Sequence, residues 1–266
     1  MTATRRLYVD GVALASPALR GPIGPLPDAT QRPVRPLLNA NERRRAPETV
    51  RLALDVAQAA LYASGHDATT VASVFTSAHG DLPTTDALCR TLADNPRLLS
   101  PTRFHHSVHN AASGYWAIGS GSHAASTALS SFEDSFAIGL LEAACQAAAD
   151  AQPVLLVAYD TQACGPLTSV NRSRGMLAAA VLLSAQPGPA STWAVDWALA
   201  QVSVAPPPLR GESARALADN AMAGALPLFE ALEARKPARL AWPLGAALAL
   251  QIDLSPHTST PSLPHT

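Results

Sequence analysis

The chain has 266 residues and a mass of 27.6 kDa, of which 48% are hydrophobic and only 15% are charged. The hydrophobic share supports a sizeable core and excludes a disordered or fibrous chain. The 19 Lys and Arg residues nearly cancel the 20 Asp and Glu residues. A formal charge of −1 therefore gives no general attraction to nucleic acid or to an anionic membrane.

Cysteine content and the lack of long apolar segments bear on the compartment. Cys89, Cys145 and Cys164 are odd in number and share no metal-binding spacing, which favours a reducing environment over a disulfide framework. No stretch approaches the roughly 18 apolar residues of a spanning helix, and the first residues lack a signal-peptide core. We therefore expect a soluble, cytoplasmic protein, with Cys145 buried as a small hydrophobic residue in a helix.

The first part of the chain predicts a strand, an irregular connection and a helix. A strand is expected over residues 7–14, and the dense prolines and glycines of residues 17–36 indicate an irregular connection. A helix is expected over residues 46–64, because Pro47 suits a first turn and Gly65 suits a helix end.

A second strand and helix follow. Residues 71–76 are a short β-rich run that ends in a turn-like sequence. Thr84 or Thr85 is expected to cap the next helix, which Asn95 and Pro96 would end.

The middle of the chain predicts a strong helix and two buried strands. Residues 132–149 carry apolar side chains on one side at helical spacing. Residues 154–159 and 177–183 are short, continuously apolar runs, as in strands covered on both faces. Strands that alternate with helices predict an α/β fold with a mixed sheet sandwiched by helices.

Beyond residue 186 the expected elements form an extension of a single domain that spans residues 1–253. Pro227 must kink or split one of the helices in this extension. The expectations are a strand at 193–204, a helix at 214–234, a last strand at 240–254 and a disordered, low-complexity tail at 254–266.

The most suggestive segment for chemistry runs from Phe104 to Ser135 and leads into the strong helix. Small residues before a helix start allow backbone N–H groups to meet an anion, so Ser130 or Ser131 is a candidate nucleophile. The competing interpretation is a capping box, in which Ser130 and Glu133 satisfy free N–H groups at the helix start. We favour capping, because it explains both residues without any chemistry.

Histidines in the same segment invite a metal-site interpretation. His105, His106 and His109 lie close together, but no carboxylate or cysteine accompanies them at a familiar spacing, and His123 lies on a different segment. We therefore expect no metal, and we expect His109 to make structural hydrogen bonds. No phosphate-binding glycine motif and no G-x-S-x-G motif is present, so no cofactor is expected.

Several segments together resemble the N-terminal half of β-ketoacyl synthases, which have the thiolase-like fold. The opening YVDGVALASP is similar to the first strand of the family, and STALSSFEDSFAIG at residues 126–139 falls where such enzymes carry T-A-C-A-S-G followed by a helix with A-I-G. The sequence GMLAAAVLL at residues 175–183 resembles the strand that closes the half-fold. Ser107 to Asn110 together with Gly114 look closer to short, chain-length-factor-like subunits of aryl polyene and related pigment pathways.

The chain departs from the pattern of this family at the catalytic residues. A condensing enzyme needs a cysteine thiolate at the helix N-terminus, but the candidate positions are Leu129, Ser130 and Ser131. The catalytic histidines of the family lie in its C-terminal half, and about 80 residues after position 185 are too few for that half. The resemblance therefore implies a subunit that does not condense acyl chains by itself.

The resemblance implies a partner instead. We expect a heterodimer with an active ketosynthase, serving condensation on acyl carrier protein and helping to set product length, without binding nucleic acid or inserting into a membrane. One alternative is a free-standing acyltransferase or thioesterase that uses Ser130 or Ser131 with a loop histidine. Another is a binding module whose acyl pocket has no condensation partner. The residues implied at the partner interface and acyl channel are His109, Asn110, Gly114, Tyr115, Trp116, Phe132 and Phe136.

Overall fold

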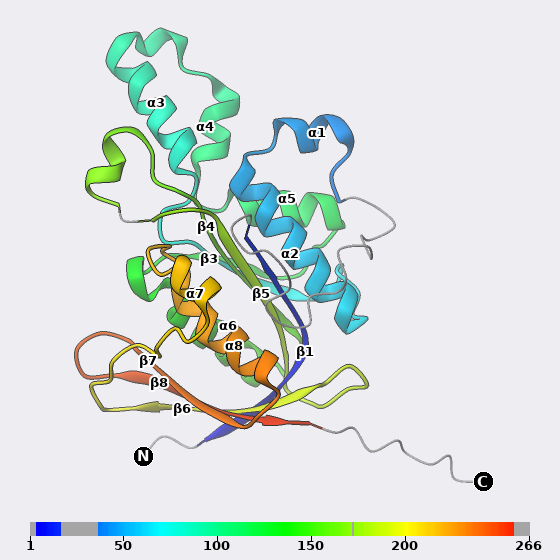
Figure 1. Cartoon of the computed structure of the whole chain (residues 1–266). Helices are drawn as coiled ribbons and strands as arrows, with labels where there is room; N and C mark the ends of the chain where they lie inside the picture. Colours follow the sequence, from blue (N-terminus) through cyan, green and yellow to red (C-terminus); the bar gives the residue numbers. More distant parts are fainter. Residues whose placement is uncertain (1–3, 17–36, 172, 258–266) are drawn as a thin grey trace.

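The computed structural model describes residues 4–16, 37–171 and 173–257 (Figure 1). In these residues the strands form one eight-stranded mixed sheet in the order β3-β2-β4-β5-β1-β6-β8-β7. The strands are β1 (Arg5–Ala15), β2 (Ala72–Thr76), β3 (Ser126–Leu129), β4 (Val154–Asp160), β5 (Leu177–Ser184), β6 (Trp193–Ala200), β7 (Ala238–Pro243) and β8 (Ala249–Pro256).

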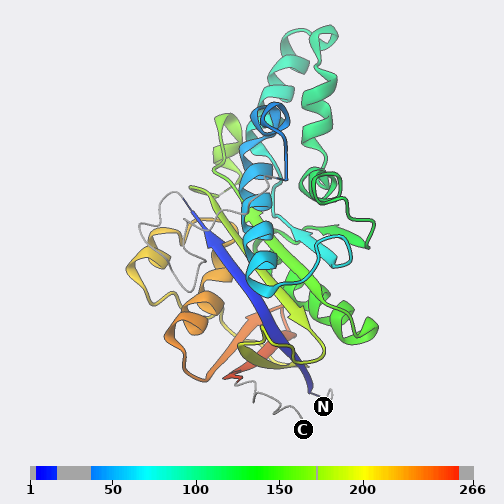
Figure 2. The same cartoon turned by 90° about the vertical axis from the view of Figure 1, so that its right-hand side faces the viewer.

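Helices cover both faces of this sheet. The α-helices are α1 (Ala40–Arg45), α2 (Glu48–Ser64), α3 (Leu82–Asp94), α4 (Pro101–Ser107), α5 (Ala111–Ser120), α6 (Ser135–Asp150), α7 (Glu212–Ala216) and α8 (Leu226–Ala234). Short 3₁₀ turns are η1 (Pro96–Leu98), η2 (Phe132–Asp134), η3 (Gly165–Ser169) and η4 (Ala223–Ala225). Figure 2 shows α3 and α4 projecting beyond the sheet at one end.

The central strands are buried on both faces, as their unbroken apolar sequences predict. Every residue of β4 and of β5 is buried, and the two strands pair antiparallel, whereas β2 pairs parallel with both β3 and β4. Alternate side chains enter two separate cores: one with α2 and α5, the other with α6, α7 and α8. The predicted α/β class, with a mixed sheet sandwiched by helices, is confirmed.

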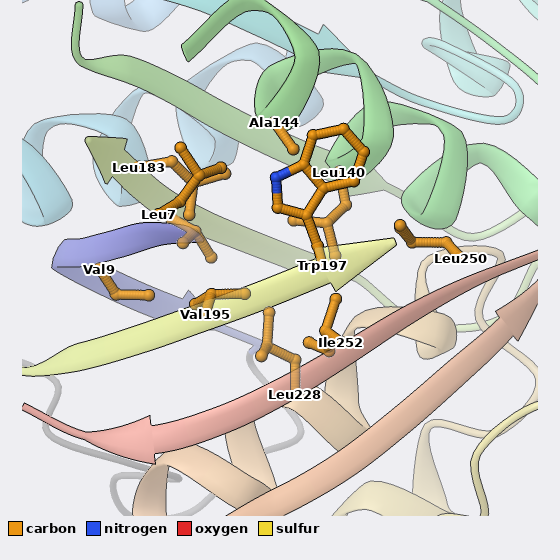
Figure 3. Close-up of a pocket in the computed structure, with 11 residues that line it drawn as sticks. Leu7, Val9, Leu140, Ala144, Leu183, Val195, Trp197, Leu228, Leu250 and Ile252 are labelled. Atoms are coloured by element: carbon orange, nitrogen blue, oxygen red, sulfur yellow. The ribbon is translucent and has the colours of Figure 1, made fainter. Parts of the chain in front are cut away.

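The core on the α6 side contains a cavity of about 10 Å³, lined only by apolar side chains (Figure 3). This is room for about one water molecule, which needs two to four polar partners to be held. The indole of Trp197 reaches into this region from β6. Its N–H is buried and has no hydrogen-bond partner among the described residues.

Helix boundaries follow local capping chemistry. Gly65 ends α2 in the left-handed conformation at φ 73°, as predicted for a helix-terminating glycine. The predicted cap of α3 is wrong: Asp81 caps it by accepting the Thr84 N–H at 2.7 Å, and the helix begins at Leu82. The carboxylate of Asp81 stands directly before a first turn that contains Pro83, and aspartate is a stronger N-cap than threonine.

Residues after 186 extend the same sheet past β1. The predicted last strand at 240–254 is wrong, because Pro243 ends β7 and a turn with Gly245 at φ 94° leads into β8. The predicted helix at 214–234 is split into α7, η4 and α8, with Pro227 in the first turn of α8.

The predicted tail begins too early, because β8 runs to Pro256. The rest of that tail, from residue 258, lies outside the described residues, as does the connection predicted at 17–36.

Candidate functional site

The strand β3 forms one edge of the sheet and leads directly into the α6 region. It pairs parallel with β2 from Ser126 to Leu129, and no strand of the described chain pairs with its other edge. The carbonyls of Ala125 and Leu129 accept N–H groups of β2. Because backbone groups alternate in direction along a strand, the N–H groups of Ser126 and Ala128 face the free edge.

The turn between β3 and α6 holds Phe132 in an unusual conformation. Phe132 has a φ of 47°, a backbone angle that residues other than glycine rarely adopt. Its side chain is exposed, at 73% for the residue. Ser135 fastens the turn, because its hydroxyl accepts the Ser131 N–H at 2.9 Å and donates to the Phe132 carbonyl at 2.7 Å. The turn thus presents a large apolar side chain to the surface at the start of α6.

The predicted capping box at this turn is wrong. Ser130 donates its hydroxyl hydrogen to the Ala78 carbonyl at 3.0 Å, and Ser131 makes no side-chain cap. Ser135, the fully buried first residue of α6, closes the turn through its hydroxyl, and within the described chain neither η2 nor α6 has a side-chain N-cap. Among the described residues, neither the Ser130 nor the Ser131 hydroxyl is hydrogen-bonded to a histidine, so the serine-nucleophile alternative gains no support.

The turn after β2 contacts the turn at Phe132 through the hydrogen bond between Ser130 and Ala78. The carboxylate of Asp160, at the end of β4, accepts the Ala78 N–H at 2.6 Å and the His79 N–H at 3.3 Å. Asp160 is fully buried, and this burial raises its pKa to about 7 in spite of these donors. Ala78 therefore links a buried carboxyl group, through its N–H, to Ser130, through its carbonyl.

Close packing of α6 on β2 positions the turn. A Cβ on Gly139 would lie 2.7 Å from the Thr76 methyl group, so only glycine allows the helix to approach this closely. The Thr76 hydroxyl also donates to the Ser135 carbonyl at 2.9 Å. The start of α6 is thus fixed to β2 by packing and by a hydrogen bond.

The predicted interface residues before β3 occupy different environments. His109 is half-buried, and its Nε2 lies 3.0 Å from the Ser77 carbonyl oxygen, the kind of structural hydrogen bond expected for it. Asn110 and Gly114 are exposed, and Tyr115 contacts His106 Nε2 through its hydroxyl at 3.0 Å.

Two aromatic residues of the predicted interface set lie inside the chain. Trp116 is 2% exposed and packs near Phe75, and Phe136 is 1% exposed and packs near Trp242. In this chain Phe132 is the exposed aromatic residue of the set. Local spacing does not show this division, because Trp116 and Phe136 are buried by packing against distant residues such as Phe75 and Trp242.

None of the three cysteines lies at the β3–α6 turn. Cys89 and Cys145 are exposed on helices and Cys164 is half-buried in a loop, so the predicted burial of Cys145 is wrong. Partial burial, followed by the neighbouring Glu142 carboxylate, raises the pKa of the Cys145 thiol, and burial also raises that of Cys164. A raised pKa disfavours the nucleophilic thiolate.

With this geometry in place, comparison with known proteins identifies the family. The sequence matches the family described as "Beta-ketoacyl synthase, N-terminal domain" over residues 20–240. The chain belongs to this family. The comparison with curated proteins gives no significant match.

Solved structures share the fold of this family member. The chain resembles one chain of the ketosynthase ApeO in complex with its chain length factor ApeC from Xenorhabdus doucetiae, at 22% identity and a TM-score of 0.67, covering 95% of this chain and 99% of that one. It also resembles a chain of the ishigamide ketosynthase/chain length factor, at 13% identity and a TM-score of 0.62, covering 94% and 99%.

A third structure is the type II PKS acyl-carrier protein in complex with its ketosynthase, AntDE:AntF, at 12% identity and a TM-score of 0.69, covering 95% and 99%. At these identities the likeness shows the fold, and it confirms the predicted thiolase-like architecture. None of the described helices is long and apolar enough to cross a membrane.

Proposed function

We propose that the chain is a non-catalytic, chain-length-factor-like subunit that pairs with an active ketosynthase. The observation that carries the proposal is the β3–α6 turn, where Leu129, Ser130 and Ser131 stand at the position at which a condensing enzyme needs its thiolate. Phe132, the next residue, is exposed and can contact a partner. The structures with this fold include complexes of a ketosynthase with its chain length factor, which agrees with this role.

The free edge of β3 supports docking of a second chain. An unpaired strand edge is a template for pairing with another strand, and short edge strands are one way in which proteins limit such pairing. Phe132, just after β3, is 73% exposed. Ile118, on α5, which packs against β3, is 77% exposed. Large apolar side chains of this exposure beside an open edge favour a protein partner over solvent.

In the proposed complex the exposed residues Asn110 and Gly114 contribute to the rim, with His109 and Tyr115 behind them, and Phe132 borders the acyl channel. Trp116 and Phe136 act from inside the chain by holding the helices that carry this surface. The partner supplies the catalytic cysteine and histidines, and acyl carrier protein meets the complex through that partner. We place the complex in the cytoplasm, in agreement with the three unpaired cysteines.

Co-expression with a full-length ketosynthase chosen from the neighbouring genes of its source genome tests the proposal. We expect a one-to-one complex that elongates acyl chains to a defined length. The Phe132→Ala variant is expected to weaken the complex at least tenfold or to shift product length, since an interface aromatic anchor is removed. A chain that stays monomeric beside this ketosynthase, with product length unaffected by its deletion, would refute the proposal.

A single proline substitution in β3 tests the docking edge separately. Ala128→Pro removes an N–H that faces the free edge and leaves the hydrogen bonds to β2 intact, so it should weaken the complex while the subunit stays folded. Ala128→Val keeps the N–H and serves as the matched control. Equal affinity of the two variants for the ketosynthase would exclude pairing at this edge.

A further inference from the structure

A second polar cluster lies at the opposite end of the parallel strands from Phe132. Its centre is Asp10, which sits at a bulge in β1: Val9 pairs with Leu183 and Gly11 pairs with Leu182, so Asp10 has no partner on β5. Bulges redirect side chains and are frequent beside functional sites. The proposed docking surface does not include this cluster, and the two proposals are independent.

Three side chains converge on the buried carboxylate of Asp10, whose side chain is 2% exposed. The Ser191 hydroxyl donates to one carboxylate oxygen at 2.6 Å, and the Ser184 hydroxyl donates to the other. His66 Nε2 lies 2.9 Å from the oxygen that Ser184 also contacts. Because a carboxylate only accepts hydrogen bonds, Nε2 of His66 must carry the hydrogen in this pair.

This pairing determines the chemistry that His66 offers. In the neutral imidazole one nitrogen donates and the other accepts, so protonation at Nε2 makes Nδ1 an acceptor. The two nitrogens point in widely divergent directions, and Nδ1 therefore faces away from the buried carboxylate. The His66 side chain is 32% exposed, and the structure gives Nδ1 no hydrogen-bond partner among the described residues.

His66 lines an open cavity of about 520 Å³, within the size range of small-molecule sites. The end of α2, the connection from α6 to β4 and the connection from β5 to β6 form its walls. One wall residue, Ala151, is the residue at which α6 ends, in the left-handed conformation at φ 52°. Small apolar residues make up much of the lining, namely Ala151, Pro153, Ala185, Pro189 and Ala190.

We propose that this cavity binds a small aromatic molecule with a hydroxyl group, a phenol, which donates its hydrogen to His66 Nδ1. The lining contains no Lys or Arg to bind an anion. A cation would gain little binding free energy, since the Asp10 carboxylate already accepts hydrogen bonds from Ser184, Ser191 and His66. The apolar walls suit a flat ring, and the fixed acceptor suits its O–H group.

Binding of p-cresol and of 4-methylanisole to the full chain, followed by ¹H–¹⁵N NMR titration, tests the proposal. The two probes share ring and methyl group, but the second has no hydroxyl hydrogen. We expect p-cresol to bind at least tenfold more tightly, with shift changes at residues 64–66 and 185–191. His66→Phe should remove the difference between the probes, whereas His123→Phe, at an exposed histidine outside the cavity, should preserve it.

The Asp10→Asn variant provides a readout that a merely structural cluster would not move. Its amide N–H₂ can donate to His66 Nε2, which places the ring hydrogen on Nδ1 and turns the acceptor into a donor. Long-range ¹H–¹⁵N spectra report this exchange, and the preference should then shift toward 4-methylanisole. If Asp10→Asn does not fold, the His66→Phe comparison decides. Equal binding of the two probes to the wild type, no binding of either, or shift changes elsewhere would overturn the proposal.

Discussion

The buried carboxyl of Asp160 predicts an unusual dependence of stability on pH. Its pKa is about 7 in the folded protein because burial disfavours the charged form, whereas an aspartate in an unfolded chain has a pKa of about 3.8. Between these two values the folded chain binds a proton that the unfolded chain has released. The contribution of Asp160 to stability is therefore fully present below about pH 4 and is lost as pH rises toward 7.

The size of this effect follows from linkage. One pH unit corresponds to about 1.4 kcal/mol, so the free energy of unfolding should fall by about 3 kcal/mol between about pH 4.5 and pH 7 from this group alone. The Asp160→Asn variant does not titrate. The wild-type free energy of unfolding minus that of the variant should therefore fall by this amount across the range, because other groups, including His79 with its burial-lowered pKa, cancel in the difference.

Urea unfolding at a series of pH values, followed by circular dichroism, measures this difference. Asp67→Asn is the matched control, because Asp67 is exposed and its hydrogen bond from the Thr69 backbone lowers its pKa, so its contribution has the opposite sign. A wild-type minus Asp160→Asn difference that stays flat, or that rises with pH, would refute the reasoning. It would mean that the Ala78 and His79 N–H groups outweigh burial and keep the carboxylate ionised.

Five further substitutions, two of them for comparison, test backbone strain and core packing, each by thermal or urea unfolding. Ala151→Gly should stabilise the chain by about 0.5–1 kcal/mol, since glycine accepts φ 52° without strain. Ala149→Gly, at an exposed position of α6, should destabilise it by a similar amount, and equal effects of the two substitutions would contradict the strain at Ala151. Trp197→Phe removes a buried N–H that has no partner in the described part of the chain, so it should change stability by less than about 1 kcal/mol. Trp242→Phe loses a 2.8 Å hydrogen bond to a backbone carbonyl and should cost about 1–3 kcal/mol, and the reverse order would contradict this assignment. Gly139→Ala should cost about 1–3 kcal/mol, because its Cβ would lie 2.7 Å from a threonine methyl group of β2; wild-type stability would show that α6 shifts freely.

Much of the fold was predictable because local patterns and burial agree in the first 185 residues. The runs at 154–159 and 177–183 are apolar at every position, and a strand is the element of that length that buries both of its faces. Gly65 marks the end of α2 for a reason that is local to the backbone. After residue 186 the prediction of one strand at 240–254 failed, since a turn near Pro243 and Gly245 produces a hairpin whose register depends on pairing with β6.

The candidate site was predictable in place but not in detail. The sequence pattern located a helix start near residues 129–132 with no cysteine, and it identified the family whose fold the chain shares. It assigned Ser130 to a capping box, because spacing alone cannot show that Ala78, 52 residues away, offers its carbonyl to that hydroxyl. The Asp10 cluster was not predicted either, since residues separated by up to 181 positions form it.

Residue polarity and spacing were enough to show which segments bury both faces, where α2, α3 and α6 end, and that no thiol stands at the start of α6. These properties depend on side-chain polarity and backbone preferences that act over a few residues. Three other properties became visible only in the folded chain: among the described strands β3 is an open edge, Phe132 rather than Phe136 faces outward, and Asp160 and Asp10 are enclosed. Those properties depend on which distant segments meet, and so on the packing of the whole sheet and its helices.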